Sequence, residues 1–115
     1  MIKVKNVTKF FDDFKVLDNV SMNVRKGTIY GLVGANGAGK TTLINHITGA
    51  LKPNGGSIEV SGENVLKNER IKQKMLGISD DWFFYSSFTV RDMMRLYRDI
   101  YSDFSMERYN AIGKL

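Results

Sequence analysis

The chain of 115 residues contains no cysteine and only one proline, one histidine and one tryptophan. The absence of cysteine excludes disulfides, thiolate zinc sites and catalysis by a cysteine nucleophile. No apolar run reaches 18 residues, the length that a membrane-spanning helix needs. Residues 1–10 lack the continuous apolar core of a secretory signal peptide and look like a strand instead. We therefore expect a cytoplasmic protein.

The charge balance is mildly basic. Lysine and arginine number 17 against 12 acidic residues, which gives a formal net charge of +5. No five like charges follow one another, and acidic pairs stand at 12–13 and 80–81. Because a nucleic-acid surface is typically a concentrated basic patch, we interpret these charges as a solvated surface and expect no nucleic-acid partner.

Apolar periodicity predicts an α/β chain that begins with antiparallel strands. Residues 2–7 and 16–24 alternate as half-buried strands do, and residues 10–15 form a turn that carries aromatic side chains. Residues 28–34 are a short apolar run typical of a buried strand. Since no helix separates these segments, antiparallel pairing is favoured.

Three helices and one further strand are predicted after residue 34. The helices cover 40–51, 65–75 and 89–101, and the strand covers 57–62. Thr89 is the expected N-cap of the last helix. Met93, Met94 and Tyr97 recur at helical spacing within it, which indicates a packing surface.

Residues 34–41, Gly-Ala-Asn-Gly-Ala-Gly-Lys-Thr, match the P-loop pattern G-x-x-x-x-G-K-[ST]. Glycine lets the backbone fold around an anion with its N–H groups turned inward, and the following helix adds its positive end. Lys40 can reach the β and γ phosphates, and Thr41 offers a hydroxyl to Mg²⁺. The competing interpretation is a glycine-rich turn with an exposed lysine.

Four stretches are distinctive together: VLDNVSMNVRKGTIYGLVGANGAGKTTL, GALKPNGGSIEVSG, SSFTVRDMM and FFDDFKVLDNV. They resemble the N-terminal part of an ATP-binding cassette (ABC) transporter ATPase subunit over about residues 1–101. The resemblance implies a truncated P-loop NTPase of the ABC type, with an antiparallel β subdomain and the start of the core sheet and of the helical subdomain. Residues 1–115 would be one partial domain: about 1–75 the catalytic core, and about 76–115 the Q-loop region and the start of the helical subdomain.

The same resemblance implies roles for individual residues. A phosphate cradle would consist of Gly34, Asn36, Gly37, Ala38, Gly39, Lys40, Thr41 and Thr42. Thr41 would bind Mg²⁺, and Thr42 would contact the α-phosphate. Phe11 stands where the family usually has a tyrosine that stacks on adenine, and phenylalanine keeps the aromatic face. Two alternatives stay open: Phe10 faces the base instead, or Phe10, Phe11 and Phe14 cap the core.

One position departs from the family pattern. Where the family normally has a glutamine ahead of residues 88–90, this chain has Asp80 or Asp81. An aspartate can approach Mg²⁺ as a hard oxygen ligand, so Asp80 is a candidate metal ligand, and an acidic surface turn is the alternative. A rival interpretation makes residues 75–81 a Walker B strand, but glycine and serine interrupt that run. His46 is interpreted as a surface or packing residue.

The 115 residues contain no LSGGQ-type signature, no apolar strand that ends in Asp-Glu and no later switch histidine. We therefore expect the front portion of a longer ATPase, inactive in hydrolysis by itself. The implied function is an ATP-binding subunit that binds MgATP to power transport through separate membrane subunits. It would pair with a second ATP-binding subunit and lie peripherally on the inner face of the cell membrane. The alternatives are a soluble ABC-type ATPase acting on ribosomes or nucleic acid, and a non-catalytic nucleotide-binding fragment.

Overall fold

The computed structural model describes residues 1–78 and 86–113. Contacts divide the chain into two compact units, Met1–Gly77 and Ile78–Leu115. The first unit contains an antiparallel sheet and helix α1, and the second contains helices α3 and α4. Asp80 and Asp81 lie outside the described residues, so their predicted role stays a prediction.

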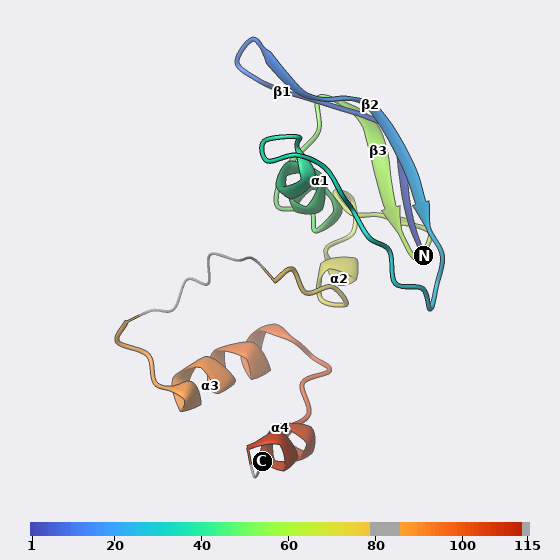
Figure 1. Ribbon diagram of the computed structural model, residues 1–115. Coiled ribbons are helices and arrows are strands. Elements are labelled where there is room, and N and C mark those ends of the chain that lie inside the picture. Colours follow the sequence, from blue (N-terminus) through green and yellow to red (C-terminus); the bar gives the residue numbers. More distant parts are fainter. Residues whose placement is uncertain (79–85, 114–115) are drawn as a thin grey trace. The chain divides into compact units, whose positions relative to one another are not determined.

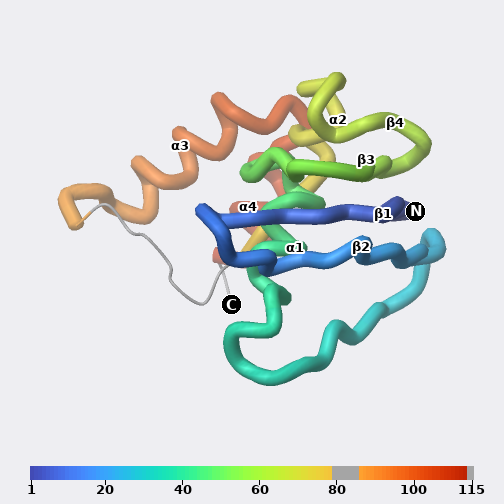
Figure 2. The backbone as a smooth tube through the Cα atoms, turned by 90° about the horizontal axis from the view of Figure 1, so that it is seen from above, coloured from blue at the N-terminus to red at the C-terminus, as the bar shows by residue number. Residues whose placement is uncertain are grey.

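The sheet of the first unit has the strand order β2-β1-β3-β4 among the described residues (Figure 2). Its strands are β1 (Ile2–Phe11), β2 (Phe14–Val24), β3 (Gly55–Val60) and β4 (Glu63–Asn64). Strand β1 pairs antiparallel with both β2 and β3. The predicted antiparallel pairing of the first two strands is confirmed, and β1 extends beyond the predicted range to include Phe11.

The pairing of β1 with β2 shifts its register at three places, and two of these bulges lie at Asn6 and Asn19. Asn6 and Asn19 each have a φ of 50°, and each bulged N–H finds a hydroxyl acceptor on the other strand. Asn6 N–H donates to Ser21 Oγ at 2.9 Å, and Asn19 N–H donates to Thr8 Oγ1 at 3.1 Å. A bulge lets residues an odd number of positions apart share a face. Apolar side chains on both sides of each bulge therefore face the core.

Helix α1 (Lys40–Ile47) lies against one face of this sheet (Figure 1). The buried core consists of aliphatic side chains from the sheet, α1, α2 (Glu69–Lys72) and the residue after β4: Val4, Val7, Leu17, Leu43, Ile58, Val60, Val65 and Ile71. Burying each such side chain contributes about 1.5–3 kcal/mol. Leu43 is the residue that α1 contributes to this core, and most of the other members come from the sheet. Helix α2 is shorter than the predicted 65–75.

Helix α1 ends at Ile47, earlier than the predicted 51, and Gly49 just after it has a φ of 73°, which suits glycine. His46, near this end, is fully buried, and its Nδ1 lies 2.8 Å from the carbonyl oxygen of Leu51. Among the described side chains, its Nε2 is the one buried nitrogen or oxygen without a hydrogen-bond partner. Of the two interpretations of His46 from the sequence, packing is the correct one.

The predicted strand at 28–34 is wrong. The described segment 25–39 contains turns and no strand, and it returns as an irregular connection along the β2 side of the sheet to the start of α1 (Figure 2). Ile29 and Val33 are 104% and 94% exposed. An apolar run becomes a buried strand only where neighbouring strands satisfy its N–H and C=O groups. Among the described residues, the four strands pair only with one another.

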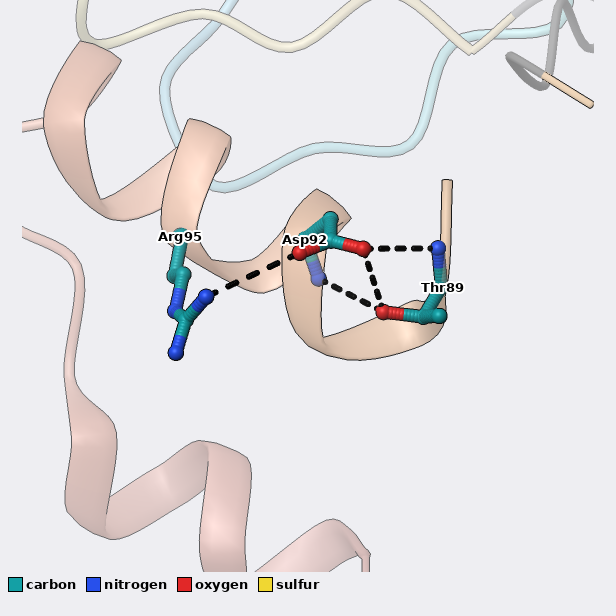
Figure 3. Close-up of polar contacts among 3 residues, drawn as sticks. All are labelled: Thr89, Asp92 and Arg95. Atoms are coloured by element: carbon teal, nitrogen blue, oxygen red, sulfur yellow. Dashed lines mark hydrogen bonds and ion pairs between the residues drawn. The ribbon is translucent and has the colours of Figure 1, made fainter. Parts of the chain in front are cut away.

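The second unit contains α3 (Val90–Ile100) and α4 (Met106–Ile112). Thr89 is the N-cap of α3, as predicted, and forms a capping box with Asp92 (Figure 3). Thr89 Oγ1 accepts from Asp92 N–H at 3.2 Å, while the Thr89 N–H and hydroxyl donate to Asp92 Oδ2 at 3.0 and 2.6 Å. These bonds satisfy first-turn N–H groups that have no partner within the helix. No helix in the described ranges is long and apolar enough to cross a membrane.

Candidate functional site

The N-terminus of α1 differs from those of the other described helices because no side chain caps it. Its N-cap residue is Gly39, whereas Asn68, Thr89 and Ser105 cap the other three with side-chain acceptors. The first turn of α1 also contains no acidic residue. Its N–H groups, at residues 40–42, have no acceptor within the helix. They are available to donate to an anion at the positive end of the helix dipole.

Glycine is required at the last loop position for two independent reasons. Gly39 has a φ of 86°, in the left-handed region. A Cβ there would also stand 2.9 Å from Leu17 Cδ2 and 3.0 Å from the carbonyl oxygen of Val16. Gly37 has a φ of 82°, but a Cβ there would meet no atom within 4 Å. The loop is therefore packed against β2 at Gly39 and open at Gly37, which leaves space beside its backbone for a ligand.

The Lys40 side chain folds back onto the loop. Its Nζ donates to the carbonyl oxygens of Gly34 and Ala35, each at 2.7 Å. These are neutral acceptors, and a phosphate oxygen forms a stronger, charge-assisted bond with an ammonium. Because the lysine side chain is flexible, exchanging these carbonyls for phosphate requires only rotation of that side chain.

The predicted cradle residues lie on one continuous stretch of loop and helix. Thr41 is exposed and Thr42 is half-buried in the first turn of α1, while Asn36 and Ala38 are exposed on the loop. Ala38 N–H donates to the carbonyl of Ala35 at 3.2 Å. Across residues 1–78 and 86–113, no group of three His, Asp or Glu side chains could hold a metal. Of the two predicted Mg²⁺ ligands, Thr41 lies within the described residues and Asp80 lies outside them.

Three phenylalanines surround the turn between β1 and β2. Phe10, Phe11 and Phe14 are 37%, 45% and 69% exposed, so each presents part of its ring to solvent. Phe11 pairs with Phe14 across the hairpin, and Phe10 pairs with Lys15. Exposed aromatic rings at a hairpin turn offer flat apolar surfaces to a planar ligand.

Phe10 and Phe11 face opposite sides of the hairpin, because successive strand residues alternate and cross-strand partners share a face. The Leu17 side chain approaches Gly39, and its cross-strand partner Lys9 shares its face of the hairpin. Phe11 follows Lys9 by two residues on β1, so it lies on the same side as the loop. Phe10 lies on the other side, where Lys15 Nζ is 5.5 Å from its ring centroid. Of the two candidates, Phe11 is the one on the side of the loop, and its stacking on a base stays a prediction.

Sequence reasoning missed Lys9. Its Nζ lies 5.1 Å from the ring centroid of Phe11 and donates to the carbonyl oxygen of Lys52 at 3.2 Å. Lys9 and Phe11 stand two residues apart on one strand, and this i, i+2 spacing is the signal that could have found the pair. Choosing Lys9 over other lysines required knowing that the strand extends to Phe11.

A glycine-rich loop, an uncapped helix N-terminus and a lysine at the first helical position define the class of P-loop nucleotide-binding proteins. The sequence profile of the family described as ABC transporter matches residues 17–113. The chain belongs to this family.

Relatives of known kind support this membership. The bacitracin transport ATP-binding protein BcrA of Bacillus licheniformis is 36% identical over 100% of this chain and 37% of its own length. The ABC transporter ATP-binding protein YtrB of Bacillus subtilis (strain 168) is 31% identical over 97% of this chain and 38% of its own length. A solved ATP-binding subunit of an ABC transporter matches with a TM-score of 0.83 and 28% identity, covering 96% of this chain and 46% of that one. The chain thus spans less than half the length of these relatives, and the predicted ABC-type P-loop fold class is confirmed.

Proposed function

We propose that the chain is the nucleotide-binding part of an ABC transporter ATP-binding subunit, which binds MgATP to power transport through separate membrane subunits. The observation that carries this proposal is the loop at the start of α1. Gly39 is packed against β2, the N–H groups of residues 40–42 have no side-chain cap, and the Lys40 ammonium lies on the same loop, at the carbonyl oxygens of Gly34 and Ala35. The printed names of BcrA and YtrB as ATP-binding proteins support the same assignment.

Each part of the site contributes a different kind of interaction with MgATP. Loop N–H groups between Gly34 and Thr42 surround the phosphates, and Thr42 lies nearest the α-phosphate. Lys40 neutralises charge on the β and γ phosphates as a point charge. The Thr41 hydroxyl is a ligand of Mg²⁺, which itself neutralises charge on the phosphate oxygens. Phe11, on the loop side of the hairpin, stacks on the adenine ring.

Hydrolysis and assembly belong to the same proposal. An activated water needs a group that orients or deprotonates it, and the 115 residues contain no Asp-Glu pair after an apolar strand. We therefore expect this chain to bind MgATP without turning it over. A second ATP-binding subunit and membrane subunits complete the transporter. The ATP-binding subunit lies peripherally, on the cytoplasmic face of the membrane. Asp80 is a further Mg²⁺ ligand in this proposal.

The decisive experiment compares Lys40→Ala with a charge-matched control, Lys26→Ala. Lys26 lies in the exposed turn after β2, so its loss changes the net charge equally without touching the loop. Titration calorimetry with MgATP is expected to show a 10- to 100-fold weaker affinity for Lys40→Ala, roughly the value of a charged hydrogen bond. Lys26→Ala is expected to bind as the parent chain does. Equal binding by all three proteins, each confirmed to be folded by circular dichroism, would remove the phosphate-loop assignment.

A further inference from the structure

We propose that Lys9 is a positioning residue for the base-stacking ring, holding Phe11 in the orientation that nucleotide binding uses. This inference rests on the proposed function, in which Phe11 stacks on adenine. It concerns a residue outside the phosphate loop, on the strand that supplies the ring. Lys9 touches the ring rather than the nucleotide.

Lys9 connects three parts of the first unit. It lies on β1, its Nζ is 5.1 Å from the Phe11 ring centroid, and the same Nζ donates to the carbonyl oxygen of Lys52 at 3.2 Å. Lys52 lies in the connection from α1 to β3. The ammonium is therefore held by a fixed backbone acceptor on one side and by the aromatic face on the other. An ammonium so placed is attracted to the ring quadrupole.

The position of Lys9 determines which face of Phe11 remains open. One face is covered by the ammonium, so a base can stack only on the opposite face. Phe11 is 45% exposed, so without this contact we expect its ring to sample several rotamers in water. Binding would then have to order the ring, which weakens the affinity. Lys9 removes that cost before the nucleotide arrives.

The hairpin offers an internal control with the same chemistry. Lys15 Nζ lies 5.5 Å from the Phe10 ring centroid, on the other face of the same hairpin, and pairs with Asp18 at 3.1 Å. Both lysines are strand residues next to an exposed phenylalanine, and both carry one charge. Only Lys9 lies on the side of Phe11. Replacing Lys15 therefore reproduces the changes in charge and strand propensity without disturbing the stacking ring.

The test measures two ligands on the full 115-residue chain and its variants Lys9→Ala, Lys9→Arg and Lys15→Ala. MgATP reports on base and phosphates together, and magnesium tripolyphosphate reports on the loop alone. Lys9→Ala is expected to weaken MgATP by roughly three- to tenfold, the cost of ordering one side chain, and to leave tripolyphosphate unchanged. Lys9→Arg is expected to restore MgATP affinity, because arginine also donates and stacks on aromatic faces. Lys15→Ala is expected to bind both ligands as the parent chain does.

Two other patterns would overturn the proposal. If Lys9→Ala weakens both ligands equally, Lys9 acts through charge on the phosphates or through the fold. If Lys9→Ala binds MgATP normally while Phe11→Ala does not, Phe11 stacks without help from Lys9. The positioning role of Lys9 is then rejected, and the proposed function is kept. A failure of the proposed function is distinct, since the parent chain would then bind neither ligand, or Phe11→Ala would bind MgATP normally.

A spectroscopic signature separates positioning from general stability. Protons above an aromatic face shift upfield, so the ε-methylene resonance of Lys9 is expected upfield of that of an exposed lysine. The shift is expected to disappear in Phe11→Ala and to persist in Phe10→Ala. An ordinary Lys9 resonance in the parent chain would contradict the contact on which the proposal rests.

Discussion

Gly39 lies directly against Leu17: a Cβ built on the glycine would stand 2.9 Å from Leu17 Cδ2. This approach joins the last residue before α1 to β2, the strand that begins at Phe14. The phosphate loop and the aromatic hairpin are therefore attached to one strand. Substitutions on β2 are therefore expected to affect both the phosphate loop and the aromatic hairpin.

The substitution Gly39→Ala tests this attachment. It is expected to destabilise the first unit more than Gly27→Ala, which has a similar φ of 76° but would place its Cβ in open space. Left-handed strain alone costs about 1–2 kcal/mol, and overpacking against Leu17 and Val16 adds about 1–3 kcal/mol. Urea denaturation of the two variants measures the difference.

A double substitution identifies the cause. Leu17→Ala removes the atom nearest the new Cβ, so Leu17→Ala with Gly39→Ala is expected to cost less than the sum of the two single changes. Exact additivity would show that the contact with Leu17 is not what requires glycine at position 39.

Replacing Phe11 by alanine is expected to weaken MgATP by about 1 kcal/mol or more, roughly fivefold in Kd, because a stacking surface is lost. Phe10→Ala is the matched control, since it removes the same side chain from the opposite face of the same hairpin. Fluorescence competition with MgATP and with magnesium tripolyphosphate checks both variants. A larger loss in Phe10→Ala than in Phe11→Ala would reverse the assignment of the two faces.

His46→Ala is expected to destabilise the first unit by about 2–4 kcal/mol, because it leaves a cavity and removes the bond from Nδ1 to Leu51. His46→Leu keeps most of the volume and removes the unpartnered Nε2, so it is expected to cost less. Ile44→Ala, on the same helix but 45% exposed, is the control and is expected to be nearly neutral. If all three variants unfold at the same temperature, His46 does not have the packing role.

The parts of the site that sequence reasoning predicted are those that local chain chemistry determines. The glycine spacing before Lys40 and the N-cap at Thr89 depend on residues a few positions apart, so their patterns are legible in the sequence. The strand at 28–34 failed because a strand depends on distant partners. The choice between Phe10 and Phe11 depends on the extra residue at Val16, where the register shifts between Lys9 and Phe10. No local pattern predicts such a bulge. Lys9 was missed for another reason: β1 extends to Phe11, beyond the predicted range of 2–7.

The capping box of α3 is expected to make this helix sensitive to acid. Hydrogen bonds from the Thr89 hydroxyl and N–H, with a smaller contribution from the charge of Arg95, hold the pKa of Asp92 below its ordinary value of 3.8. Because the pKa is lower in the folded state, the carboxylate stabilises α3 above pH 3.8, and this contribution is lost as the pH falls through the lowered value. The amide resonances of residues 90–95 are expected to show this loss between about pH 4 and 2.

Substitutions separate this effect from general acid unfolding. Asp92→Asn is expected to lose the pH dependence of these resonances, whereas Asp103→Asn, an exposed aspartate after α3, is expected to keep it. Thr89→Ala removes the acceptor of the Asp92 N–H and is expected to cost about 1 kcal/mol of helix stability at neutral pH. If Asp92→Asn titrates as the parent chain does, the acid transition belongs to another carboxylate and the box does not stabilise α3. If only Asp92→Asn and Thr89→Ala reduce the stability of α3, the reciprocal bonds between Thr89 and Asp92 stabilise the start of this helix, because each variant removes one half of the capping box.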